Sequence, residues 1–112
     1  MEANHVIQAL AALAQEHRLA AFRYLVQCGP DGAAAGAIGD ALGIPASSLS
    51  FHLAQLERSG LITRVRKSRS LIYSADFATM NRLVGYLMEN CCGGAVCLTA
   101  SECLPANERN AA

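Results

Sequence analysis

Residues 35–74 contain the pattern that most restricts the fold, namely two helical segments, a tight turn between them, and a hairpin. Helices are predicted over about Ala35–Leu42 and Ala46–Ser59, with Gly43 and Pro45 interrupting the chain between them. Ser47 is predicted to cap the second helix, and Gly60 to follow its last turn. A short helix, a tight turn and a second helix are typical of a helix-turn-helix.

Two runs of alternating apolar and polar residues follow the second helix, at residues 61–67 and 69–74, with Ser68 between them. Such alternation predicts a two-stranded β-hairpin, here with a serine where glycine is common at the turn. A hairpin placed directly after a helix-turn-helix is typical of a winged helix-turn-helix.

Three further helices complete the predicted fold. Apolar residues at helical spacing place two of them at about 4–14 and 16–28, and a third at about 77–90 with Asp76 as its N-cap. The order α-α-α-α-β-β-α gives a mainly α fold with a small β-hairpin (α+β). We assign residues 1–90 to a winged helix-turn-helix domain for DNA binding and dimerisation, and residues 91–112 to a cysteine-containing tail.

The apolar content is high for a short chain, at 53% of 112 residues. A small domain with few charges often covers part of its apolar surface in a subunit interface, which favours an oligomer. We find no segment long enough to span a membrane and no export signal, so we expect a cytoplasmic protein.

The second helix of the helix-turn-helix has two chemically different faces. At about 100° per residue, Leu49, Leu53 and Leu56 share the face expected to pack inward. Short hydroxyls and an amide on the other positions suit contacts with bases and phosphates, and an aromatic ring suits a thymine methyl group. The predicted DNA contacts are Ser47, Ser48, Ser50, Phe51, His52 and Gln55. For His52, a hydrogen bond within the fold is the slightly favoured alternative.

The basic residues are concentrated around the hairpin although the net charge is zero. Five of the nine lie in residues 58–69, which contain no acid. A local basic patch favours phosphate binding, while a solvated hairpin is an alternative of equal weight on this feature alone. The predicted phosphate contacts are Arg66, Lys67 and Arg69.

These motifs resemble those of ArsR/SmtB-type repressors over roughly residues 10–90. The resemblance rests on Leu13-Ala14, His17-Arg18-Leu19, Ile38-Gly39, Leu42-Gly43, Ser47, Ser50, His52-Leu53, Ser59-Gly60-Leu61-Ile62 and the segment Arg66 to Tyr73. It implies a homodimer joined mainly by the first and last helices, bound to double-stranded operator DNA and released by an inducer. The second helix of the motif lacks the cysteine pair that many arsenic sensors of the family carry at its start.

Four of the five cysteines lie in residues 91–112, and three of them form the segment Cys91-Cys92-Gly93-Gly94-Ala95-Val96-Cys97. We expect reduced thiols, because the cysteine count is odd and no export signal is present. Glycines let the chain bend so that the three sulfurs approach one soft ion. A subclass of arsenic-responsive ArsR-type repressors is similar in this arrangement, which implies that Cys91, Cys92 and Cys97 bind trivalent arsenic: arsenite, methylarsenite or antimonite.

Other functions remain open at this point. With Cys103 as a fourth ligand, the inducer would be zinc or cadmium. A disulfide joining Cys91 or Cys92 to Cys97 or Cys103 would make the chain a redox-responsive repressor. A thiol-based metal(loid) carrier would have no use for the basic hairpin. We expect no permanent cofactor and no enzymatic activity, because no nucleophile–base pair, acid pair or phosphate-binding loop is present.

Overall fold

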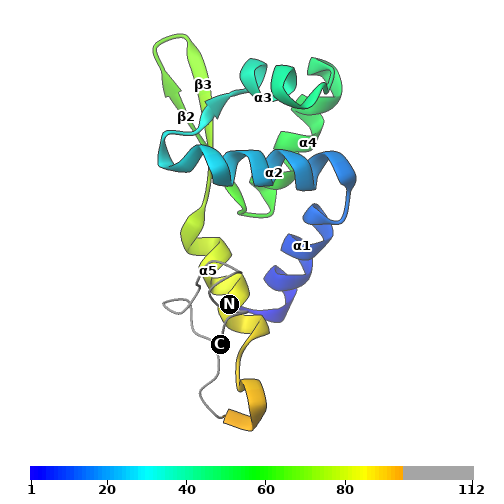
Figure 1. The fold of residues 1–112 in the computed structure, drawn as a ribbon, viewed down its shortest axis with the longest axis vertical. Helices are drawn as coiled ribbons and strands as arrows, with labels where there is room; N and C mark the ends of the chain where they lie inside the picture. The colour runs from blue at the N-terminus through cyan, green and yellow to red at the C-terminus, as the bar shows by residue number, and fades with distance from the viewer. Residues whose placement is uncertain (95–112) are drawn as a thin grey trace, which may run out of the picture.

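The computed structural model describes residues 1–94 and confirms the predicted winged helix-turn-helix (Figure 1). Cys97, Cys103 and the rest of the predicted tail beyond Gly94 lie outside the described residues. The elements are α1 (Ala3–Leu13), α2 (Glu16–Cys28), the 3-10 turn η1 (Gly29–Asp31), β1 (Ala33–Ala34), α3 (Ala35–Leu42), α4 (Ala46–Arg58), β2 (Ile62–Lys67), β3 (Ser70–Ala75), α5 (Phe77–Leu87) and the turn η2 (Cys91–Gly94).

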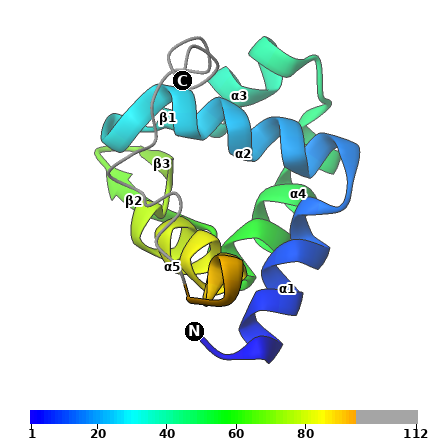
Figure 2. The ribbon, with the colours of Figure 1, turned by 60° about the horizontal axis from the view of Figure 1, so that its bottom comes forward.

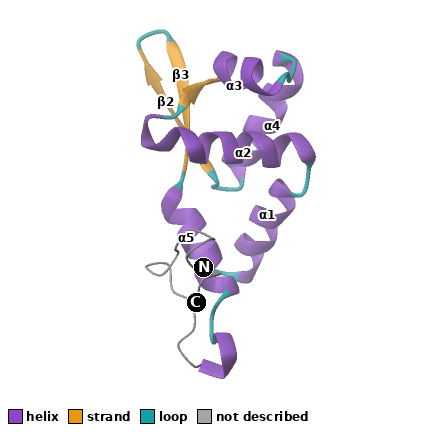
Figure 3. Ribbon diagram, in the orientation of Figure 1, coloured by secondary structure: helices purple, strands orange, loops and turns teal. Residues whose placement is uncertain are grey.

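The sheet has three antiparallel strands in the order β1-β3-β2, so the prediction of a two-stranded hairpin was incomplete (Figure 3). β1 contains only two residues, which is too short to show alternation in the sequence. Its residue Ala33 pairs with Tyr73 of β3. Gly32 makes this approach possible, because a Cβ at that position would lie 2.1 Å from the Tyr73 carbonyl oxygen. The extra strand therefore fixes the start of α3 against the hairpin.

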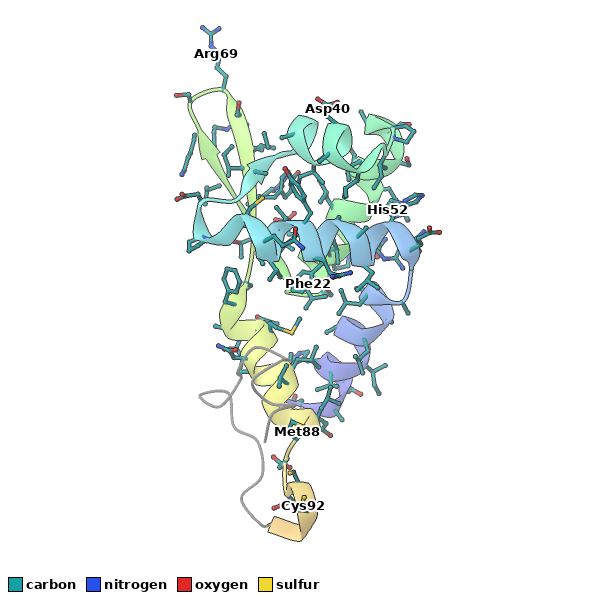
Figure 4. The ribbon with its side chains drawn as sticks, in the orientation of Figure 1. Phe22, Asp40, His52, Arg69, Met88 and Cys92 are labelled. Carbon is teal, nitrogen blue, oxygen red and sulfur yellow. The ribbon has the colours of Figure 1, made fainter. Side chains whose placement is uncertain are left out.

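The hairpin, which forms the wing, turns through two residues, Ser68 and Arg69, between the paired Lys67 and Ser70. Ser68 adopts the left-handed conformation with φ 57°, which glycine would adopt more easily. Arg69 was predicted in the second strand but lies in the turn. Its side chain therefore points away from the body of the molecule at the tip of the wing (Figure 4).

The helix-turn-helix forms as predicted, except at the N-cap of α4. Gly43 ends α3 in the left-handed conformation, and Gly60 follows α4 with φ 85°. The N-cap position of α4 is Pro45, so the predicted cap at Ser47 was wrong. The nearby Ser48 hydroxyl acts as a donor and not as a cap acceptor, because its Oγ donates to the Pro45 carbonyl oxygen at 3.2 Å. Ser47 therefore lies in the first turn with its hydroxyl exposed.

The core lies where α2, α3, α4 and the sheet meet. Its largest fully buried side chains are Leu25, Ile38, Leu49, Leu53, Leu56, Leu61 and Ile62. The predicted inward face of α4 is thus confirmed, because all three of its leucines are buried. This packing holds the opposite face of α4 toward solvent.

Helix α5 extends from the core toward the far end of the molecule. Asp76 caps it as predicted, accepting a hydrogen bond from the Thr79 backbone N–H at 3.0 Å. The helix ends at Leu87 rather than near Asn90, which has a left-handed φ of 56°. The apolar pattern continues past Leu87, but Leu87 and Met88 are exposed, so little packing holds this end of the chain in a helix.

Helices α1 and α5 contact each other and carry an exposed apolar surface (Figure 2). Only part of the predicted stripe of α5 is buried: Leu83 is 3% exposed, whereas Leu87 is 57% exposed. The other large exposed apolar side chains of the two helices are Ile7, Leu10, Phe77, Val84, Tyr86 and Met88 (beyond the end of α5). No helix within residues 1–94 is both long and apolar enough to cross a membrane.

Candidate nucleic-acid interface and thiol site

Helix α4 presents three of its six predicted DNA contacts directly to solvent. Ser47, Ser50 and Phe51 are exposed, and the Phe51 ring keeps 59% of its surface accessible. A large apolar ring so exposed on a helix that packs through its opposite side is available to a partner. The outward face of α4 therefore combines hydroxyl groups with one aromatic contact.

The other three predicted contacts on α4 are half-buried, and each lies against different neighbours. Ser48 uses its hydroxyl within the first turn. Gln55 lines a cavity together with Arg18 and Arg58. His52 lies beside the N-terminal end of α2, with its ring centroid 5.5 Å from that of His17 (Figure 4). These three side chains are less accessible to DNA than the exposed three.

The hydrogen bond expected for His52 within the fold is not formed. Its Nδ1 atom is buried and has no hydrogen-bond partner among the described residues. Burial lowers the pKa of His52 below its ordinary value of 6.5, and the positive charge of Arg18 and the neighbouring His17 lower it further. The neutral imidazole is therefore the favoured form in the folded protein.

The wing carries cations without neutralising partners. Arg66, Lys67 and Arg69 are exposed and form no ion pair within residues 1–94. Arg64 differs, because its Nε atom lies 3.2 Å from Glu57 Oε2 at the end of α4. Three basic side chains thus remain available for phosphate on the same end of the molecule as the start of α4.

The cysteine pair lies in a separate turn after α5. Cys91 carries a free thiol, whereas Cys92 is disulfide-bonded, so the expectation of reduced thiols was wrong for Cys92. The Cys91 and Cys92 sulfurs are 3.8 Å apart. The chain bends here through left-handed conformations at Asn90, Cys92 and Gly93, so the bend predicted at the glycines begins three residues earlier. Because α5 ends at Leu87, four residues before Cys91, its helix dipole has little effect on these sulfurs.

Two sulfurs of the predicted ion site are therefore close together, and the third ligand, Cys97, lies outside residues 1–94. Within those residues no group of three or more His, Cys, Asp or Glu side chains could hold a metal ion. Figure 4 shows Cys92 and Arg69 at opposite ends of the long axis, in a molecule whose principal extents are 49 × 33 × 26 Å. Within residues 1–94, α5 is the element that connects the cysteine turn to the rest of the fold.

Comparison with known proteins identifies the fold family. A model described as a helix-turn-helix domain matches residues 13–65. An ArsR-like transcriptional regulator from Rhodococcus sp. RHA1 is 25% identical, with a TM-score of 0.68 over 75% of this chain and 76% of that one. The transcriptional repressor BigR from Xylella fastidiosa is 28% identical, with a TM-score of 0.62 over 80% and 89%. The chain shares the winged helix-turn-helix fold of ArsR-type transcriptional regulators and is similar to them in sequence.

A third structure, reduced HlyU from Vibrio cholerae N16961, is 25% identical, with a TM-score of 0.62 over 80% of this chain and 90% of that one. No curated protein matches the sequence. The proteins to which the chain is similar are transcriptional regulators, which are not enzymes. The matched segment ends at residue 65, so it covers the helix-turn-helix and leaves the cysteine turn outside.

Sequence reasoning treated His17 and His52 separately and so missed their contact. The two residues are 35 positions apart, and only the packing of α2 on α4 brings the rings together. The resemblance of His17-Arg18 and His52-Leu53 to family motifs was the only signal that singled out both positions.

The lowered pKa of His52 predicts a pH-dependent stability. The unfolded chain binds a proton at His52 more readily than the folded one, so stability is expected to fall as pH drops through 6.5 toward the folded-state pKa. In urea titrations, His52→Gln should flatten this dependence between about pH 7.5 and 5.5. An identical slope in His52→Gln and the unmodified chain would contradict the assignment.

Proposed function

We propose that the chain is a cytoplasmic homodimeric repressor of the ArsR/SmtB type that binds operator DNA through α4 and the wing. It releases the DNA when trivalent arsenic binds Cys91, Cys92 and Cys97. The observation that carries the inducer assignment is the 3.8 Å separation of the Cys91 and Cys92 sulfurs in their turn. The DNA-binding part rests on the exposed face of α4 and the unpaired cations beside it.

The first step of the argument is the fit of α4 to DNA. In a helix-turn-helix the second helix enters the major groove, and a wing contacts the backbone. Phe51 is placed to reach a thymine methyl, and Ser47 and Ser50 to reach base edges or phosphates. Arg66, Lys67 and Arg69 then supply the salt-dependent, sequence-independent part of the affinity.

The second step is dimerisation through α1 and α5. Their exposed apolar side chains form a surface that a monomer would leave in water. A winged helix-turn-helix domain from Mycobacterium bovis with the same fold, 24% identical, is homodimeric. A second copy of the chain covers the surface in this proposal and fixes the spacing of two reading helices on one operator.

Leu87→Asp tests the dimer, because it places a charge at the most exposed apolar position of α5. We expect sedimentation analysis to show a monomer and operator affinity to fall by at least tenfold, since each monomer then binds a single half-site. Val26→Asp, at an exposed apolar position of α2, is the matched control and should remain dimeric. A dimer that survives Leu87→Asp with unchanged affinity would place the interface elsewhere.

The third step is the fit of the cysteine turn to a soft ion. Two sulfurs bound to one ion through bonds of about 2.3 Å must lie within about 4.6 Å of each other. The Cys91 and Cys92 sulfurs, 3.8 Å apart, meet this condition, and reduction of the Cys92 disulfide makes both thiols available. No histidine or carboxylate joins them to make a three-ligand group within residues 1–94, which favours an all-sulfur site with Cys97.

Three thiolates suit trivalent arsenic better than zinc, which prefers four ligands and would need Cys103 as well. When bound, the ion supplies three bonds to sulfur that draw the segment after α5 together. The ion can act on DNA affinity only by binding the DNA-free arrangement of the dimer more tightly than the DNA-bound one. Because α5 leads from the cysteines to the dimer surface, that surface is the route through which the two sites would be coupled.

Arsenite binding to the full-length, chemically reduced chain tests the inducer directly, without DNA. We expect saturable binding that consumes free thiols in proportion, and that is lost in the double variant Cys91→Ser with Cys92→Ser. Cys28→Ser is the matched control, because this thiol lies at the end of α2, remote from the turn. Arsenite binding that persists in the double variant would exclude the site.

A redox-responsive repressor is the second candidate. The structural neighbour HlyU has been solved in a form described as reduced, and Cys92 of this chain is disulfide-bonded. This alternative predicts operator release by peroxide, reversed by dithiothreitol, in protein stripped of metal ions. Zinc or cadmium as inducer predicts release by those ions, and a thiol carrier predicts arsenite binding without any operator binding.

A further inference from the structure

A cavity of about 340 Å³ lies where α1, α2 and α4 meet, on the other side of the core from the sheet. Its walls include Gln8 of α1, Arg18 of α2, and Gln55 and Arg58 of α4. This volume is near the lower end of the range for small-molecule sites, which begins at about 300 Å³. The functions proposed for the cysteine turn and for the exposed face of α4 do not explain this cavity.

The cavity is cationic although the chain has no net charge. Two of its lining residues, Arg18 and Arg58, are permanently charged, and none is acidic. Arg18 is fixed in place, because its Nε donates to the Ala12 carbonyl oxygen at 2.6 Å. Arg58 forms no ion pair in the described part of the chain. The ion pair found there joins Arg64 to Glu57.

The remaining lining groups add hydrogen-bond donors and room. The side-chain amides of Gln8 and Gln55 face the cavity from opposite helices and can each donate two N–H bonds. Ala11 and Ala12 lie on the α1 side, and their small side chains keep the space open. Fixed guanidinium groups and amides around a small space suit planar or tetrahedral oxyanions.

We propose that this cavity binds a small anion that carries a phosphate or carboxylate group, held by Arg18 and Arg58 with the amides of Gln8 and Gln55. Two sources share this chemistry. One is a free small anion, and the other is a backbone phosphate of bound DNA. The anion joins α1 to α4 in either case, and so links the proposed dimer helix to the helix that reads DNA.

The test is titration of the full-length, isotope-labelled chain with inorganic phosphate at constant ionic strength, followed by NMR. We expect saturable shifts at the Arg18 Nε–H and at the side-chain amides of Gln8 and Gln55. Arg58→Gln should weaken phosphate binding by about tenfold or more, as expected for loss of a charge-assisted hydrogen bond. Ala11→Leu should also weaken it strongly, because it fills the space without changing any charge.

Arg23→Gln is the matched control, since it removes an exposed cation from α2 outside the cavity and should leave phosphate binding unchanged. Arg58 and Ala11 are both exposed, so neither variant disturbs the core. Shifts that fail to saturate, or that weaken equally in Arg23→Gln and Arg58→Gln, would show general charge screening and overturn the proposal. Because no DNA is present, this outcome does not depend on the repressor function.

Operator binding in phosphate-free buffer then separates the two sources. If the cavity holds a DNA phosphate, Arg58→Gln lowers the operator affinity and reduces the slope of log affinity against log salt by about 0.9. If it holds a free anion, Arg58→Gln leaves both unchanged while phosphate binding is still lost. Both results support an anion site and differ only in where the anion comes from.

Discussion

Leu53→Ala is expected to lower the free energy of unfolding by about 2–5 kcal/mol. Leu53 is only 1% exposed and lies on the inward face of α4, so the substitution leaves a cavity between that helix and the core. A loss of this size is a large part of the total stability of about 5–15 kcal/mol that a single domain has. Urea denaturation would show it as a lower midpoint with an unchanged slope.

Phe51→Ala, two residues earlier on the same helix, is the matched control for this prediction. Its ring is 59% exposed, so we expect the free energy of unfolding to change by less than about 0.5 kcal/mol. Operator affinity should fall, in contrast, because the ring lies on the face proposed to meet the bases. Equal destabilisation by the two substitutions would mean that Phe51 is packed inward and that the assigned faces of α4 are wrong.

Replacing Arg66, Lys67 and Arg69 together with glutamine is expected to weaken DNA binding more than any single change on α4. Each contact that neutralises a phosphate contributes about 0.9 to the salt dependence, so the slope should fall in magnitude by up to about 2.7. Affinity for operator and for unrelated DNA should fall in similar proportion, because the wing contacts are proposed to be with the backbone. Titrations at several salt concentrations give both quantities.

Arg64→Gln provides the control within the same strand. Arg64 is paired with Glu57 at 3.2 Å, so its charge is already partly compensated and it should contribute little to phosphate binding. A salt slope that changes as much for Arg64→Gln as for one of the wing cations would indicate that the ion pair opens on DNA. An unchanged slope in the triple variant would remove the wing from the interface.

The helices were predictable because their determinants are local. The three leucines of α4, the glycines after α3 and α4, and Asp76 before α5 are read directly from neighbouring residues, and the structure confirms each. The failures depend on interactions that are distant in sequence. The strand β1 exists only through its pairing with β3, and the end of α5 depends on packing that the periodic pattern does not reveal.

The same distinction between local and long-range determinants applies to the candidate site. Exposure of Ser47, Ser50 and Phe51 follows from helix periodicity. Exposure of the wing cations does not follow from strand alternation, because every residue of β2 after Ile62 is exposed and Arg69 lies in the turn. The contact of His17 with His52, and the cavity that holds Arg18 and Arg58, each require α2 to be placed against α4. The sequence alone could not reveal either one, since neither has a short-range pattern.

Fluorescence anisotropy of a labelled duplex from the DNA upstream of the gene tests the central claim most directly. The reduced, full-length chain should bind the duplex and release it on addition of arsenite, as should Cys28→Ser. The double variant Cys91→Ser with Cys92→Ser should bind equally well and remain bound in arsenite. Full release of the double variant by arsenite, or no release of the unmodified chain, would contradict the account.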